Sequence, residues 1–251
     1  MKNSATPVGV ARRAQVPFVA TFFFLALLVP LSVWPALSER REPWQQALAA
    51  MPIAAATPEL NRTNCVQTLL SAFKPNEIVK AIIFMPGATD ELYLFRRARA
   101  ALTNGNPTVL DALMALTNQT FIHATFRAPF LLLHTDEDPL EPANRIQDQK
   151  TAERLRSLVL VERLRCDDWD WDALQPVLKH SLKIALRPWR YSTQSWHFYR
   201  YSFAAYHLDG LEALELAALA GKTKFTLRRK EAVFELDPRV LAAPKFDAHL
   251  R

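Results

Sequence analysis

The chain has few of the residues that mark several common protein classes. It contains five glycines and two cysteines among 251 residues. The small number of glycines and the lack of a low-complexity tract argue against a disordered or fibrous protein. No C-x-x-C pair is present, so a zinc ribbon or a thioredoxin-like redox site is not expected. No segment recurs visibly at a fixed period, so an array of repeats is not expected either. Half of the residues are apolar, which is enough to build a substantial core.

Acidic residues are absent from positions 1–38, which contain Lys2, Arg12 and Arg13. Without these three cations the chain has 28 basic residues (31 minus 3) against 25 acidic ones. A remainder with so little net charge gives no reason to expect nucleic acid as a partner.

Residues 16–37 form an uncharged, mostly apolar run, VPFVATFFFLALLVPLSVWPAL. Its length suits a helix that crosses the ~30 Å hydrocarbon core of a bilayer. Because cations precede the run, the positive-inside rule places residues 1–15 in the cytoplasm and the remainder in the periplasm or outside the cell. We therefore expect a single-pass anchor in the membrane. A cleaved signal peptide ending near residues 36–38 is the main alternative, and a buried core helix is a third reading.

The remaining chain is predicted to be a proline-interrupted linker, residues 38–58, and one mixed α/β domain, residues 59–251, whose residues 187–251 could form a subdomain. Alternating helices and strands predict a sheet with helical cover, and adjacent strands make that sheet mixed rather than parallel. The predicted strands are 78–85, 121–126, 130–134, 158–164 and a terminal hairpin of 223–228 and 232–236. The predicted helices are 59–73, 90–102, 107–118, 144–157, 171–186, 194–207 and 211–220, with Gly221 as a left-handed stop.

Carboxylates follow three of the predicted strands, at Asp90, at Asp136 and Asp138, and at Asp168. If the strands run parallel, these side chains converge at one edge of the sheet. Carboxylates that close together favour a hard divalent cation such as Mg²⁺, which could orient a phosphate or activate water. The alternative is that these acids only cap helices and solvate turns.

An apolar strand followed by Asp136-x-Asp138, with Asp167-Asp168 later, resembles the haloacid-dehalogenase-like phosphatases. That family has a Thr two residues beyond the second Asp, where this chain has Leu140. The resemblance covers only these turns, and no catalytic role is carried over from it.

An aromatic and basic segment contains Trp189 and Trp196. If exposed, these rings could stack on a glycan or lie beside a lipid headgroup. The alternative is that Trp196 lies on a helical stripe with Tyr199, Phe203 and Tyr206 that packs into the core. A basic run over 222–230 could bind anionic headgroups or protect an edge strand from aggregation.

The two cysteines, Cys65 and Cys166, could form a disulfide if the domain is exported into an oxidising compartment. Two buried free thiols are the alternative. Neither a Gly-x-Ser-x-Gly elbow nor a phosphate-binding glycine loop is present. The sequence thus favours an envelope protein with a non-catalytic interaction or structural domain and a protein partner. The alternative is a metal-dependent hydrolase that acts on a phosphate or similar anion through carboxylates at strand ends.

Overall fold

A computed structural model describes residues 41–54, 59–61, 63–85, 98–135, 141–160, 163–188 and 200–236. All of them belong to the second of two units into which the chain divides, Met1–Arg40 and Arg41–Arg251. The helices described are α1 (Pro43–Ala49), α2 (Cys65–Ala72), α4 (Val109–Gln119), α5 (Gln149–Arg156), α6 (Trp171–Leu182) and α7 (Gly210–Ala220). The longer strands are β2 (Ala81–Met85), β4 (His123–Arg127), β5 (Phe130–His134), β8 (Leu164–Trp169), β9 (Ala185–Pro188), β10 (Tyr201–Ala205), β12 (Thr223–Arg228) and β13 (Glu231–Leu236). Two-residue strands are β1 (Glu59–Leu60), β3 (Ala100–Ala101), β6 (Arg145–Ile146), β7 (Val159–Leu160) and β11 (Leu208–Asp209).

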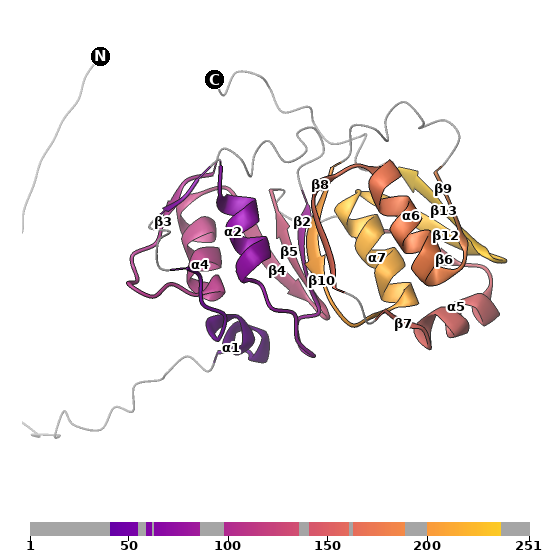
Figure 1. Ribbon diagram of the computed structural model, residues 1–251, viewed down its shortest axis with the longest axis horizontal. Coiled ribbons are helices and arrows are strands. Elements are labelled where there is room, and N and C mark those ends of the chain that lie inside the picture. Colours follow the sequence, from indigo (N-terminus) through magenta and orange to yellow (C-terminus); the bar gives the residue numbers. More distant parts are fainter. Residues whose placement is uncertain are drawn as a thin grey trace, which may run out of the picture. The chain divides into compact units, whose positions relative to one another are not determined.

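A five-stranded sheet in the order β4-β5-β2-β10-β8 lies at the centre, with α1, α2 and α4 on one face and α6 and α7 on the other (Figure 1). Its side chains alternate between two cores, as the period of two in a strand requires. Ile82 and Phe84 of β2 belong to the core beneath α1, α2 and α4, whereas Ala81 and Ile83 belong to the other. Because both faces are covered, β2, β5 and β10 are buried along their whole length, as expected for central strands.

A four-stranded sheet in the order β6-β12-β13-β9 covers the far side of α6 and α7. Phe225 and Phe234 of this sheet share one core with Ile83 of the central sheet. α7 therefore lies between two sheets, which explains why apolar or small residues occupy most of its circumference. The prediction of a mixed α/β fold with several helices, and of a C-terminal hairpin, is confirmed.

The described chain contains two copies of one supersecondary unit, although no segment of the sequence recurs at a fixed period. In the first copy β1 pairs antiparallel with β3, β2 pairs parallel with β5, and β4 pairs antiparallel with β5. In the second copy the same pairings join β8 with β10, β9 with β13, and β12 with β13. We call residues 43–134 repeat 1 and residues 149–236 repeat 2. The helices α1, α2 and α4 occur in repeat 1 at the places of α5, α6 and α7 in repeat 2.

The second half of each repeat aligns without a gap at a shift of 101 positions (210 minus 109). α4 and α7 both have 11 residues, and the hairpins β4–β5 and β12–β13 follow at the same distance. Thr108 and Asp209 are N-caps of capping boxes at equivalent positions. The bridge of Thr108 to Pro52 also matches the pairing of Asp209 with Val159.

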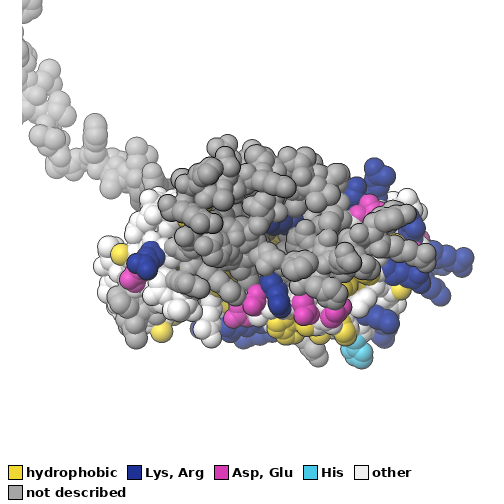
Figure 2. Space-filling model, turned by 90° about the horizontal axis from the view of Figure 1, so that it is seen from above, with side chains coloured by type: hydrophobic (Ala, Val, Ile, Leu, Met, Phe, Trp, Pro, Cys, Tyr) yellow, Lys and Arg dark blue, Asp and Glu magenta, His cyan; other side chains and the backbone are white. Residues whose placement is uncertain are grey.

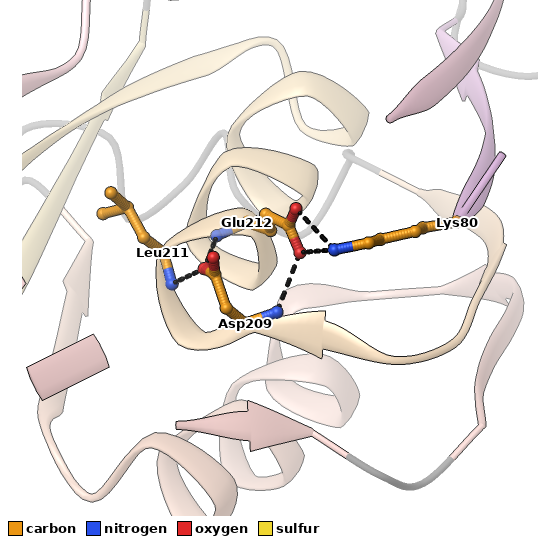
Figure 3. A network of polar contacts seen from close by, with 4 residues as sticks. All are labelled: Lys80, Asp209, Leu211 and Glu212. Carbon is orange, nitrogen blue, oxygen red and sulfur yellow. Dashed lines mark hydrogen bonds and ion pairs between the residues drawn. The ribbon is translucent and has the colours of Figure 1, made fainter. Parts of the chain in front are cut away.

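Strand pairing and the ion pair between Lys80 and Glu212 are among the contacts that join the two repeats. β10 of repeat 2 pairs antiparallel with β2 of repeat 1, which makes the central sheet continuous. Beside this junction the Asp209 carboxylate accepts hydrogen bonds from the backbone N–H groups of Leu211 and Glu212, both at 2.8 Å (Figure 3). The Glu212 carboxylate accepts from the Asp209 N–H and binds the Lys80 Nζ at 2.8 Å. Glu212, which belongs to the capping box of α7 in repeat 2, thereby also binds repeat 1 through Lys80.

Several sequence predictions are wrong in detail. The predicted helix 194–207 overlaps β10, and the predicted helix 90–102 ends where β3 lies. The predicted helix 171–186 stops at Leu182, because Lys183 adopts φ 53° and β9 follows. Gly221 has φ −93° rather than a left-handed conformation, and a Cβ there would lie 2.7 Å from the Tyr201 hydroxyl. Glycine is therefore needed at this position because a side chain would clash with Tyr201, not because the backbone adopts a left-handed conformation.

The segment predicted as a linker, 38–58, contains α1 and contributes Leu48, Met51 and Ile53 to a core. No helix within the described ranges is long and apolar enough to cross a membrane. Residues 16–37, on which the membrane prediction rests, lie outside those ranges.

Candidate functional site

The carboxyl ends of three strands meet at one edge of the central sheet. β2 and β5 are parallel neighbours, and β8 runs in their direction because both β2 and β8 are antiparallel to β10. Met85, His134 and Trp169 therefore end their strands at the same edge. The prediction that the acidic segments converge required these strands to run parallel, and they do. Open α/β sheets bind ligands at the carboxyl ends of their strands.

Of the four carboxylates predicted to bind a metal, the structure describes one. Asp90, Asp136 and Asp138 lie outside the described ranges, and Asp168 lies within them. Among the described residues, no group of three or more His, Cys, Asp or Glu side chains could hold a metal ion. The divalent-cation site therefore stays a prediction.

Asp168 lies inside β8 rather than in a turn after it. Cys166 pairs with Phe203 and Trp169 pairs with Tyr201, so β8 has one more residue than β10 between these pairs, as in a β-bulge. Asp168 adopts φ 59° there, a conformation that Asp tolerates better than most residues. Its backbone N–H donates to the Ser202 hydroxyl at 3.0 Å. The bulge thus ties the end of β8 to β10 at the candidate edge.

A buried imidazole lies at the same edge, on the last residue of β5. The His134 side chain is 1% exposed, and its Nε2 lies 2.8 Å from the Thr125 hydroxyl of β4. The ring of His123 stacks on it with centroids 5.5 Å apart. These contacts with β4 position the buried imidazole at the carboxyl end of β5.

Arg200 also lies at this edge, where it contacts the end of β8. Its Nη1 donates to the backbone carbonyl of Asp168 at 3.4 Å and lies 3.9 Å from the Asp170 carboxylate. Sequence reasoning did not single out His123 and Thr125, the partners of His134. The alternation of polar residues His123, Thr125 and Arg127 along β4 is a signal that could have indicated them, because alternate residues of a strand share a face.

The two cysteines are free and buried, and they lie in different cores. Cys65 belongs to the core beneath α1, α2 and α4, whereas Cys166 belongs to the core on the opposite face of the central sheet. Burial raises the pKa of the Cys65 thiol to about 12 and also raises the pKa of Cys166. The disulfide is therefore not formed in this structure, which agrees with the alternative of two buried free thiols.

The aromatic and basic segments differ in how much of them is described. Trp189 and Trp196 lie outside the described ranges, so stacking on a glycan or headgroup stays a prediction. In the basic run, Lys222 is buried and Lys224 Nζ lies 3.6 Å from the Glu235 carboxylate across the hairpin. Within this run, the exposed residues are Arg228 at the end of β12 and Arg229 and Lys230 in the turn after it.

With this geometry in hand, the chain was compared with protein-family models, curated proteins and solved structures, and none of them matches it.

Proposed function

We propose that the protein is a single-pass envelope protein whose domain outside the cytoplasm binds another protein rather than transforming a substrate. The proposal combines the uncharged run of residues 16–37 and the cations before it with a domain built by duplication. Duplicated units that share a sheet offer extended surfaces for partners, a use common among repeat proteins.

The observation that carries the proposal is the junction between the repeats. At this junction the carboxylates of Asp209 and Glu212 cap the start of α7, and Glu212 also binds Lys80 of repeat 1. Asp148 and Asp170 likewise accept backbone N–H groups at the starts of α5 and α6. Carboxylates committed to caps stabilise a scaffold, which is what a non-catalytic interaction domain requires.

Reporter fusions test the location. Alkaline phosphatase joined after Arg251 is expected to be active, because it would lie outside the cytoplasm, whereas the same enzyme joined after Gln15 is expected to be inactive. Crosslinking of the full-length chain in intact membranes is expected to trap a specific protein partner. A full-length chain that is freely soluble with its first forty residues intact, or a lone monomer after crosslinking, would overturn the proposal.

A metal-dependent hydrolase is the second candidate, favoured by the common edge at which β2, β5 and β8 end. The test is thermal unfolding of the full-length chain in the presence of Mg²⁺, Mn²⁺ or Ca²⁺. The wild type is compared with the variants Asp136→Asn and Asp168→Asn. The exposed Glu59→Gln in β1 is the matched control. A metal-induced rise in Tm that both Asp variants lose and the control keeps would support this function, and no rise with any metal would remove it.

A further inference from the structure

Repeat 2 has a pocket between α5 and the turn of the β12–β13 hairpin. Lys150, Thr151 and Arg154 line it from the helix, and Arg228, Arg229 and Lys230 line it from the hairpin. Figure 2 shows Lys and Arg side chains gathered at the end of the view where Figure 1 places β6, β12 and β13. Five cationic side chains from two elements therefore surround one concave site.

The equivalent place in repeat 1 is filled by an aromatic side chain. The matching pairings of Pro52 with Thr108 and of Val159 with Asp209 place Trp44 of α1 opposite Thr151 of α5. The Trp44 ring stacks on Phe126 of β4 with centroids 5.5 Å apart. In repeat 2 the smaller Thr151 occupies that place and lines the pocket. The pocket is thus a difference between the repeats, not a feature of the fold they share.

Four of the five cations around the pocket are also specific to repeat 2, and the fifth, Arg228, matches Arg127 of repeat 1. Arg229 and Lys230 replace the uncharged Ala128 and Pro129 of the hairpin in repeat 1. Lys150 and Arg154 correspond to Pro43 and Ala47 of α1 at the same alignment. Repeat 1 forms the same helix and hairpin without these cations, so folding does not require them.

Within the described ranges, none of the five cations forms an ion pair. Arg154 donates only to the Leu182 carbonyl, at 3.4 Å. The pocket's carboxylate, Asp148, is engaged at the start of α5, where it accepts the Thr151 hydroxyl at 2.7 Å and the Thr151 N–H at 3.2 Å. In repeat 1, by contrast, Arg127 lies 3.4 Å from the Glu141 carboxylate. The pocket therefore has cationic donors in excess of its own acceptors.

We propose that this pocket binds the phosphate group of an anionic ligand. Guanidinium groups donate in a planar fork that matches phosphate oxygens, and lysine adds a mobile point charge. A concave cluster in which five cations outnumber the one lining carboxylate, Asp148, holds such a group better than scattered surface cations do. The pocket's chemistry does not depend on where the protein lies, so this inference stands apart from the proposed function.

The test is calorimetric titration of the full-length chain in a neutral detergent and a chloride buffer. The probes are inorganic phosphate and soluble dihexanoyl phosphatidylglycerol, which separate a free phosphate from a lipid headgroup. The double variant Arg229→Gln/Lys230→Gln removes two exposed cations of the turn. Arg127→Gln is the matched control, because it changes the equivalent hairpin of repeat 1.

We expect saturable binding of at least one probe, weakened about tenfold or more in the double variant and within about twofold of wild type in the control. Tighter binding of phosphatidylglycerol than of phosphate would assign the pocket to a headgroup, and the reverse order to a free phosphate. Failure of both probes to bind, or equal binding by wild type and double variant, would overturn the inference.

Discussion

The two repeats share one chain path but differ in what surrounds their last helix. α4 of repeat 1 packs on a single sheet and leaves Met114 52% exposed on its outer side. α7 of repeat 2 has a sheet on both sides and buries eight of its residues, most of them alanine or leucine. The same position in the fold is thus filled by a helix with one apolar side in repeat 1 and by a helix that is buried on nearly all sides in repeat 2. The distribution of apolar residues around a helix depends on how many of its sides pack against other elements.

The largest expected effect comes from giving repeat 2 a residue of repeat 1. Gly210 begins α7 where Val109 begins α4. A Cβ at Gly210 would lie 2.9 Å from the Leu155 carbonyl oxygen and 3.1 Å from Leu182 Cδ2. Gly210→Val therefore forces α5 and α6 away from α7, and we expect it to lower the free energy of unfolding by about 3 kcal/mol. Urea unfolding of the full-length chain in neutral detergent measures this loss.

Gly105→Ala is the control for this substitution. It adds a methyl group with no atom within 4 Å and is expected to change stability by about 0.5 kcal/mol or less. If Gly210→Val were as stable as this control, the close approach of α5 to α7 would be wrong.

The second prediction concerns the junction. Glu212 binds Lys80 of repeat 1, whereas its equivalent Asp111 binds Asn104 of its own repeat at 2.7 Å. The Lys80 and Glu212 side chains are 21% and 19% exposed, so Lys80→Met leaves a mostly buried carboxylate without its cation. We expect a loss of about 2 kcal/mol in the same unfolding experiment. Asn104→Ala, at an exposed bond, is expected to lose about 0.5 kcal/mol. Equal losses would mean that the ion pair does not hold the repeats together.

The sequence allowed the hairpins and α7 to be predicted because each satisfies a local rule. The β12–β13 hairpin alternates apolar and polar residues, and β5 is a continuous apolar run behind a turn. β10 was missed because Phe203 and Tyr206 have helical spacing with Tyr199. The structure instead buries every residue from Tyr201 to Ala205 between two helical layers, and a strand buried on both faces has no period of its own.

The duplication and the pocket escaped sequence reasoning for a related reason. Over 108–135 and 209–236 the identical residues are Leu110, Ala112, Leu113, Thr125 and Arg127 with their partners in repeat 2. Different surroundings changed most other positions, including the burial pattern of α7. The pocket depends on Thr151 and Trp44, whose equivalence follows only from strand pairing.

The third prediction concerns the outer edge of β9. In repeat 1 the equivalent edge of β2 pairs with β10, whereas no strand within the described ranges pairs with this edge of β9. Ala185 bonds to β13 through the Lys230 carbonyl, so Leu186 points its own carbonyl outward. The Gln175 side chain of α6 donates to that carbonyl at 2.7 Å. The Gln175 side chain thus satisfies a backbone carbonyl at the outer edge of β9, where a further strand would otherwise pair.

Gln175→Ala leaves this carbonyl without its donor, and we expect a loss of about 1 kcal/mol in urea unfolding. An uncovered strand edge also favours pairing between chains, so sedimentation velocity is expected to show more self-association than in the wild type. Ser181→Ala, which removes an exposed hydroxyl of the same helix, is the control. If both variants behave alike, the Gln175 contact does not protect the edge.

The smallest effect is expected at Glu215, which takes the place of the exposed Met114 on a helix that now has two covered sides. Burial raises the pKa of the Glu215 carboxyl, the Arg127 guanidinium of repeat 1 opposes that rise, and the Glu212 and Asp209 carboxylates add to it. A carboxyl whose pKa is raised by folding contributes stability below its unfolded pKa and loses it as the pH rises through the folded value. Glu215→Gln is therefore expected to be more stable than the wild type near pH 7 and equal to it near pH 3, by Tm measured across that range. The exposed Glu153→Gln should show no such pH-dependent gain, and a gain for Glu215→Gln that persists at low pH would mean that burial of the charge is not its cause.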